Sequence, residues 1–142
     1  MGQTVLSSDS DPTPGGTTDA AHRAIGAARA ADAKLGTNTV VLEVGDIIAI
    51  TEWFVITSAP NTRQVRTICD EVEAQLKELA GIGPVSVEGL AGASWVLLDY
   101  GDVVVHVFLD ETREYFDLER LWADAPRLDW SAEPAASAAA PT

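Results

Sequence analysis

Apolar and polar positions along the chain follow two periods, one typical of helices and one typical of strands. Residues 19–35 are Ala-rich and predict a helix, which we expect Gly36 to end in the left-handed conformation. Residues 61–80 predict a second helix more strongly, because their apolar side chains recur at steps of three and four and share one face. The apolar stripe of the first helix is weaker and consists of Ile25, Ala28, Ala31 and Leu35.

Five other segments are rich in β-branched and aromatic residues and predict strands: 39–44, 53–57, 85–88, 95–100 and 103–109. Residues 47–50 are apolar but fit neither period, and residues 117–122 predict a short final helix. The predicted order is therefore α-β-β-α-β-β-β-α. We expect an α/β (α+β) fold in which a mixed five-stranded sheet is flanked by helices.

The two ends of the chain have the composition of unfolded segments. Residues 1–17 are rich in Ser, Thr, Asp, Pro and Gly, and residues 131–142 are mostly Ala, Pro and Ser. Because such sequences bury too little apolar surface to fold, we expect a tail at each end and one domain at 18–130. No apolar run is long enough to cross a membrane. A lone cysteine, Cys69, fits a reducing compartment, so we expect a cytoplasmic protein.

Gly101 and Asp102 separate two β-rich runs, and a two-residue loop of this kind predicts a tight hairpin in which Gly101 has a positive φ. Because such a loop fixes the register, the opposing pairs can be named: Tyr100 and Val103, Asp99 and Val104, Leu98 and Val105, Leu97 and His106, Val96 and Val107, Trp95 and Phe108. Side chains alternate along a strand, so the hairpin has two faces of different composition.

One face of the hairpin is almost wholly aliphatic and should lie under helices; it consists of Val96, Leu98, Tyr100, Val103, Val105 and Val107. The other, which we call the mixed face, consists of Trp95, Leu97, Asp99, Val104, His106 and Phe108. Two interpretations of the mixed face compete. Either a helix covers it and His106 and Asp99 hydrogen-bond internally, or it is an open patch of the kind that forms binding hot spots. The weak apolar stripe of the first helix favours the open patch.

The formal net charge of the 142-residue chain is −13, from 22 acidic and nine basic residues. Of these, 18 acids and all nine bases lie within residues 20–130, so the predicted domain itself carries −9. Proteins bind phosphate backbones through Lys and Arg, which argues against direct, sequence-specific binding of nucleic acid. An acidic surface instead favours a partner with a basic face.

Sequence motifs of common catalytic sites are absent: the chain has no G-x-S-x-G, G-x-x-x-x-G-K-[ST], H-E-x-x-H or G-x-G-x-x-G. His106 and Asp99 are an acid–base pair in composition, but nucleophilic catalysis needs a third member. The turn between Asp99 and Asp102 directs the two carboxylates apart, which disfavours a magnesium site. We therefore predict no enzyme activity, no cofactor and no metal site.

Three runs of the sequence carry a family resemblance. In order, they are EWFVITSAPNTRQV (52–65), WVLLDYGDVVVHVF (95–108) and TREYFDLERLW (112–122). Each resembles a signature of the iojap-related ribosomal silencing factor family (RsfS), and the likeness covers about residues 20–125.

This resemblance implies a nucleotidyltransferase-like fold without demonstrated transferase activity, usually a homodimer in the cytosol. It also implies binding to a large-subunit ribosomal protein at the subunit interface, the universal large-subunit protein fourteen. There the factor would sterically block joining of the small subunit and repress translation under nutrient limitation. The alternatives are a large-subunit assembly factor and, less favoured, a nucleotidyltransferase-like enzyme, since the chain lacks that fold's Gly-Ser turn followed by Asp-x-Asp.

Residues of the mixed face and of its turn match the family signature. The predicted partner-binding residues are Trp95, Leu97, Asp99, Gly101, Asp102, His106 and Phe108, together with Arg63 at the start of the second helix. We expect Trp95 to insert among apolar groups of the ribosomal protein, while Asp99 or Asp102 meets a Lys or Arg. Candidate contacts of the homodimer are Phe116, Leu121 and Trp122.

Overall fold

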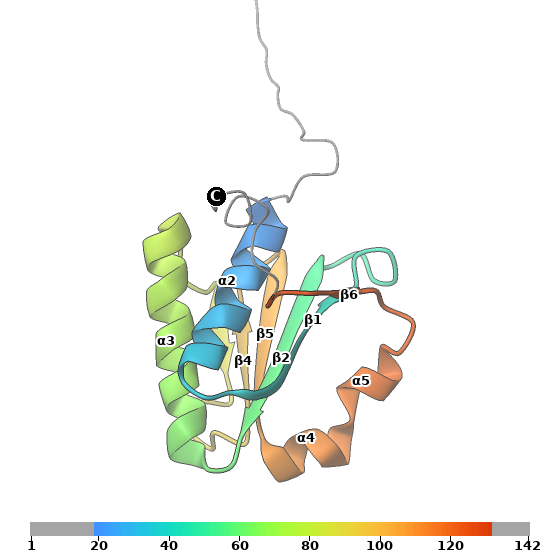
Figure 1. The fold of residues 1–142 in the computed structure, drawn as a ribbon. Coiled ribbons are helices and arrows are strands. Elements are labelled where there is room, and N and C mark those ends of the chain that lie inside the picture. The colour runs from blue at the N-terminus through green and yellow to red at the C-terminus, as the bar shows by residue number, and fades with distance from the viewer. Residues whose placement is uncertain (1–18, 132–142) are drawn as a thin grey trace, which may run out of the picture.

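A computed structural model of the chain describes residues 19–131, which form helices packed on one sheet (Figure 1). The elements, in chain order, are α2 (Asp19–Ala33), β1 (Thr37–Glu43), β2 (Trp53–Ala59), α3 (Thr62–Ala80), β3 (Ser86–Glu88), β4 (Trp95–Asp99), β5 (Val103–Leu109), α4 (Asp110–Phe116), α5 (Leu118–Leu121) and β6 (Arg127–Leu128). The strand order is β3-β4-β5-β2-β1-β6, in which β2 and β5 are parallel and the other neighbours are antiparallel. The predicted tails, 1–17 and 131–142, lie outside the described residues except for Ser131.

The α+β class, the predicted strands and the two long helices are confirmed, with boundaries that shift by a few residues. The strand count is wrong by one, because β6 adds a two-residue edge strand that pairs with Val41 and Leu42 of β1. Residues 47–50 lie in the loop between β1 and β2. The final helix predicted at 117–122 is preceded by an unforeseen one, α4, and a left-handed Asp117 at φ 50° separates α4 from α5.

Helix α2 packs through its alanines rather than through large side chains. Its buried residues are Ala20, Ala21, Ala24, Ala27, Ala28, Ala30 and Ala31. Ile25 is only partly buried and Leu35 is 74% exposed, so the predicted stripe is wrong at these two positions. Small side chains let α2 lie close to α3 and to the sheet, and close packing makes up for its low hydrophobicity. No helix within residues 19–131 combines the length and apolarity needed to cross a membrane.

The residue that ends α2 also differs from the prediction. The left-handed residue is Leu35, at φ 67°, and Gly36 does not have a positive φ. Gly36 is needed instead for a close approach of the chain to β2, because a Cβ atom there would collide with the hydroxyl of Thr57. The glycine therefore serves packing between the helix end and the sheet.

The β4–β5 hairpin has the register that its two-residue turn predicts. The five residues of β4 pair with β5 as expected, from Trp95 opposite Phe108 to Asp99 opposite Val104. The N–H of Tyr100 donates to the carbonyl of Val103 at 2.9 Å, and Gly101 has φ 91°. All six residues of the aliphatic face are buried, in the same core cluster as α2 and α3.

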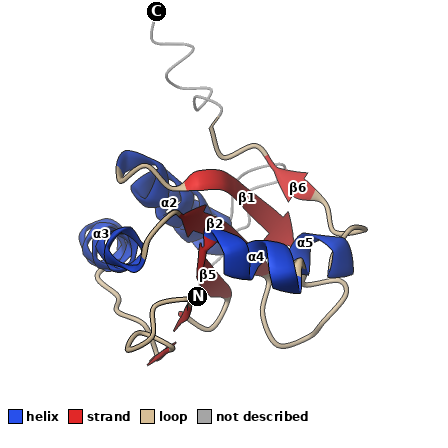
Figure 2. Ribbon diagram, turned by 90° about the horizontal axis from the view of Figure 1, so that it is seen from below, coloured by secondary structure: helices blue, strands red, loops and turns tan. Residues whose placement is uncertain are grey.

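The mixed face is covered over one half and open over the other, so each of the two competing interpretations holds for part of it. Helices α4 and α5 lie apart from α2 and α3 (Figure 2). Leu118, Trp122 and Ala125 pack in one cluster with Val104 and Phe108 on β5 and with neighbouring side chains of β1 and β2. In this cluster the ring centroids of Trp122 and Phe54 lie 5.4 Å apart. Towards β4, side chains of the mixed face remain partly exposed.

Candidate functional site

The open half of the mixed face is centred on Trp95, whose indole is fixed on several sides. Its N–H donates to Nδ1 of His106 at 3.1 Å. Its ring stacks on Phe108, with centroids 4.8 Å apart and planes 30° apart. Phe116, at the end of α4, contacts the same indole at a centroid distance of 4.8 Å. Trp95 nevertheless remains partly exposed, so a rigid aromatic ring faces solvent.

Other apolar side chains extend this exposed area. Tyr115 is 82% exposed and Phe116 49% exposed, and their rings meet edge to face at 5.0 Å. Leu97 is partly exposed on the mixed face, next along β4. We call Trp95, Leu97, Tyr115 and Phe116 the Trp95 surface. A hollow of about 280 Å³ borders it, lined by Glu88, Gly89, Trp95 and Leu97.

His106 and Asp99 do not form the acid–base pair that their shared face allowed. The imidazole is 5% exposed and burial lowers its pKa to about 4. Asp99 instead accepts a hydrogen bond from the N–H of Gly101 at 2.8 Å through Oδ1, which closes the turn. His106 is therefore a neutral imidazole whose Nδ1 accepts from an indole, while Asp99 serves the turn instead.

The eight predicted site residues fall in three places. Five of them share the mixed face: Trp95, Leu97, Asp99, His106 and Phe108. Gly101 and Asp102 lie in the turn, where the Asp102 carboxylate forms an ion pair with Arg23 of α2. Arg63 is exposed in the first turn of α3, beside the end of α2, and α3 packs on the opposite face of the sheet. Of the five, His106 and Phe108 are buried and support the surface from beneath.

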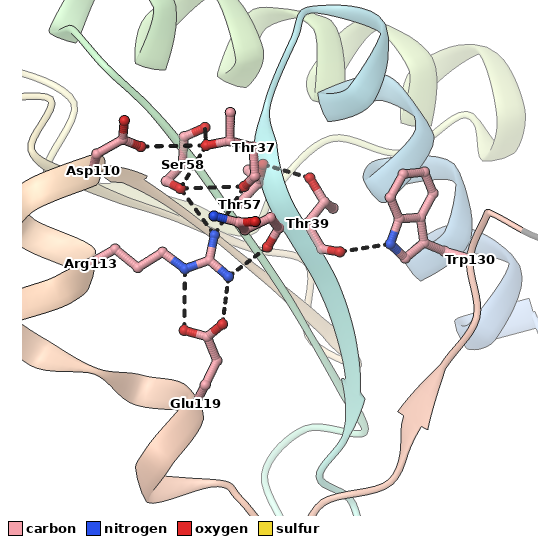
Figure 3. Close-up of polar contacts among 9 residues, drawn as sticks. Thr37, Thr39, Thr57, Ser58, Asp110, Arg113, Glu119 and Trp130 are labelled. Atoms are coloured by element: carbon pink, nitrogen blue, oxygen red, sulfur yellow. Dashed lines mark hydrogen bonds and ion pairs between the residues drawn. The ribbon is translucent and has the colours of Figure 1, made fainter.

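Arg113 of α4 organises a second cluster, which the sequence analysis did not single out (Figure 3). Its guanidinium is buried and donates to the carbonyls of Thr37 and Asn38 at 3.0 and 2.6 Å. It also donates to the Ser58 hydroxyl at 3.0 Å and to both carboxylate oxygens of Glu119 at 3.2 and 2.6 Å. These bonds tie α4 and α5 to the ends of β1 and β2. In the sequence, the one feature that pointed to Arg113 is its position in the TREYFDLERLW run that carries the family resemblance.

A hollow of about 610 Å³ adjoins this cluster and is lined by Thr37, Asn38, Ser58, Asp110, Arg113, Glu114, Asp117 and Glu119. Every nitrogen of the Arg113 guanidinium already donates to a group within the protein. The hydrogen bond from Arg113 lowers the pKa of Glu119. Among residues 19–131, no group of three or more His, Cys, Asp or Glu side chains is arranged to hold a metal ion. The Arg113 cluster is thus a structural clamp, and the Trp95 surface is the candidate binding site.

Comparisons with known proteins find a matching family model and several relatives. A model of the family described as "Ribosomal silencing factor during starvation" matches residues 17–142. Ribosomal silencing factor RsfS of Bacillus subtilis is 41% identical over 103 residues, which cover 72% of this chain and 86% of that protein. The mouse protein named "Mitochondrial assembly of ribosomal large subunit protein 1" is 33% identical over 84 residues, 58% of this chain and 37% of its own length.

Solved structures give the same result for the fold. The crystal structure of a Chromobacterium violaceum protein superposes with a TM-score of 0.71 at 29% identity. The match covers 82% of this chain and 95% of that one. The arrangement of helices and sheet is therefore shared with a protein of known structure.

Proposed function

Because this chain belongs to the RsfS family of ribosomal silencing factors, we propose that it binds the large ribosomal subunit and blocks subunit joining. The proposed contact is the universal large-subunit protein fourteen, at the face that meets the small subunit. Occupancy of that face prevents association sterically, and translation falls when nutrients are limiting. The protein acts in the cytoplasm in this proposal.

The Trp95 surface is the observation that carries the proposal. Large aromatic side chains that are rigidly held yet exposed are the usual centres of protein interfaces, because they bury much area at little entropic cost. Trp95, Tyr115 and Phe116 form such a group, from two elements that meet only in the folded chain. Leu97 beside them adds an aliphatic contact.

The charge of the chain supports a protein as the direct partner. Residues 20–130 carry a net charge of −9, which repels ribosomal RNA and attracts a basic ribosomal protein. Asp99 and Glu88 lie near the Trp95 surface: Asp99 shares its face, and Glu88 lines the adjoining hollow. Basic residues of the partner would meet these carboxylates at the rim of the apolar contact.

A role in assembly of the large subunit is the second candidate, since the mouse relative is named for such a role. Both functions use the same binding surface and differ in the stage at which the factor is bound.

The family is one of silencing factors rather than enzymes. A residual transferase activity is tested by calorimetric titration of the protein with ATP or CTP and magnesium.

Co-sedimentation tests the proposal directly. The full chain is mixed with purified large subunits, small subunits or both, and separated on sucrose gradients. It should migrate with the large subunit and reduce the peak of joined ribosomes, and Trp95→Ala should weaken binding by about 2 kcal/mol or more. Leu35→Ala, which truncates an exposed leucine after α2, is the matched control. Migration with neither subunit, or full binding by Trp95→Ala, would contradict the proposal.

The family resemblance also leads us to propose a homodimer. Leu121 is 73% exposed and Phe116 49% exposed, so both remain candidate contacts, whereas Trp122 packs on Phe54. Analytical ultracentrifugation of the chain and of Leu121→Ser tests this proposal. A monomer at all concentrations in the unmodified chain would refute it.

A further inference from the structure

His106 lies at the centre of the mixed face, between the covered and the open halves. Across the sheet it is opposite Leu97 on β4 and Ile56 on β2. The ring of Phe54 packs edge-on against the imidazole, with a centroid distance of 4.7 Å and an angle of 74° between the ring planes. Because only 5% of His106 is exposed, a partner on the Trp95 surface would not touch it.

The polar contact of His106 is directed at Trp95. An imidazole nitrogen that accepts a hydrogen bond is unprotonated, so the neutral ring that accepts at Nδ1 carries its proton on Nε2. Nε2 is buried and has no hydrogen-bond partner among residues 19–131. Burial lowers the pKa of His106 to about 4, so Nδ1 stays available as an acceptor at neutral pH. The buried imidazole of His106 thus forms one hydrogen bond within residues 19–131, and its partner is the partly exposed indole of Trp95.

We propose that His106 is a positioning residue of the binding site: its Nδ1 holds the Trp95 indole in the orientation in which Phe108 and Phe116 support it. The partner therefore meets a preformed aromatic surface and does not have to order the indole on binding. Affinity rises because a side chain that is already fixed loses less conformational entropy in the complex. This inference rests on the proposed function of the Trp95 surface and assigns His106 an indirect role within it.

Two variants separate the hydrogen bond from the packing of the ring. His106→Leu keeps much of the volume but removes the acceptor. His106→Asn is smaller, yet its Oδ1 atom occupies nearly the position of Nδ1 and can accept from the indole. If the acceptor matters, Asn retains more binding than Leu. If only filling of the core matters, the order is reversed.

The first readout is the free protein, by ¹⁵N NMR of its indole N–H groups. The four tryptophans give one signal each, and Trp95→Phe identifies that of Trp95. We expect this signal alone to shift and its N–H to exchange faster in His106→Leu, with recovery in His106→Asn. An unchanged Trp95 signal in folded His106→Leu would overturn the proposal.

The second readout is affinity for purified large subunits. We expect His106→Leu to bind about fivefold to tenfold more weakly, the range of one lost hydrogen bond, and His106→Asn to recover part of the loss. Equal binding by His106→Leu and the unmodified chain, or weaker binding by Asn than by Leu, would refute the positioning role. Failure of the unmodified chain to bind would instead refute the proposed function, and the NMR result would still decide whether His106 orients the indole.

Discussion

Arg113 and Glu119 are joined by two hydrogen bonds of 3.2 and 2.6 Å across the left-handed residue that separates α4 from α5. The same guanidinium donates to two backbone carbonyls that follow α2 in the chain. One side chain therefore fixes the angle between two short helices and anchors both to the sheet. Since α4 carries Phe116, this clamp also sets where Phe116 meets Trp95.

Removal of Arg113 should be severely destabilising. Arg113→Met leaves the carbonyls of Thr37 and Asn38 and the Glu119 carboxylate without their donor, in a largely buried place. Breaking one partner of a buried pair costs about 3 kcal/mol or more. Urea denaturation should show this loss, while Arg120→Met, at an exposed position of α5, should stay near the stability of the unmodified chain. Equal losses in the two variants would contradict the clamp.

The stability of the fold should decrease in mild acid because of His106. Burial lowers its pKa from 6.5 in the unfolded chain to about 4 in the folded protein, so between these values the unfolded chain binds the extra proton. The free energy of unfolding therefore falls as the pH falls through this window, by at most about 1.4 kcal/mol per pH unit. Glu119 acts in the same direction, since the Arg113 hydrogen bond lowers its pKa.

Comparison of the unmodified chain with His106→Leu isolates the imidazole from the carboxylates. Urea unfolding at several pH values from 4.5 to 7 gives the free energy of unfolding as a function of pH. This free energy should change less steeply with pH in His106→Leu, because that variant lacks the group whose protonation differs between the folded and unfolded states. Parallel slopes in the two proteins would show that His106 takes up its proton equally in both states.

Much of the fold and the centre of the site could be predicted from the sequence for a local reason. A two-residue turn at Gly101 fixes the register of β4 and β5, and alternation then assigns each residue to a face. The buried state of His106 could not be predicted in this way. It depends on tertiary contacts: Phe54, from a different part of the chain, packs against the imidazole, and Trp122, from a segment with little apolar periodicity, packs on Phe54.

Arg113 illustrates the same limit more strongly. In the sequence it is one base among acidic residues of a short segment, a pattern typical of a solvated surface. Its burial results from partners that are far away in the chain, such as Thr37 and Ser58. The alanine contacts of α2 were underestimated for a related reason, because hydrophobicity alone does not measure how closely small side chains let a helix approach.

Truncation of the exposed aromatic residues should weaken large-subunit binding without a comparable loss of stability. Tyr115 is 82% exposed and contacts Phe116 at its edge, so Tyr115→Ser removes little buried area from the free protein. In the complex it removes an aromatic contact, and we expect an affinity loss of about 1 kcal/mol or more. Gradient binding and urea denaturation of the same samples test both parts. Ile50→Ser, at an 84% exposed position in the β1–β2 loop, is the control.

The two carboxylates of the hairpin should respond differently to neutralisation. Within residues 19–131, Asp99 forms no ion pair and lies on the mixed face, whereas Asp102 is paired with Arg23 of α2. Asp99→Asn keeps an acceptor for the N–H of Gly101 but removes the charge, so the turn survives while attraction for a basic partner falls. We expect weaker binding to large subunits and a smaller dependence on salt for Asp99→Asn. Asp102→Asn should bind like the unmodified chain and lose at most about 1 kcal/mol of stability, as for a partly exposed ion pair. A larger binding defect in Asp102→Asn than in Asp99→Asn would place the partner at the turn and on α2 rather than on the Trp95 surface.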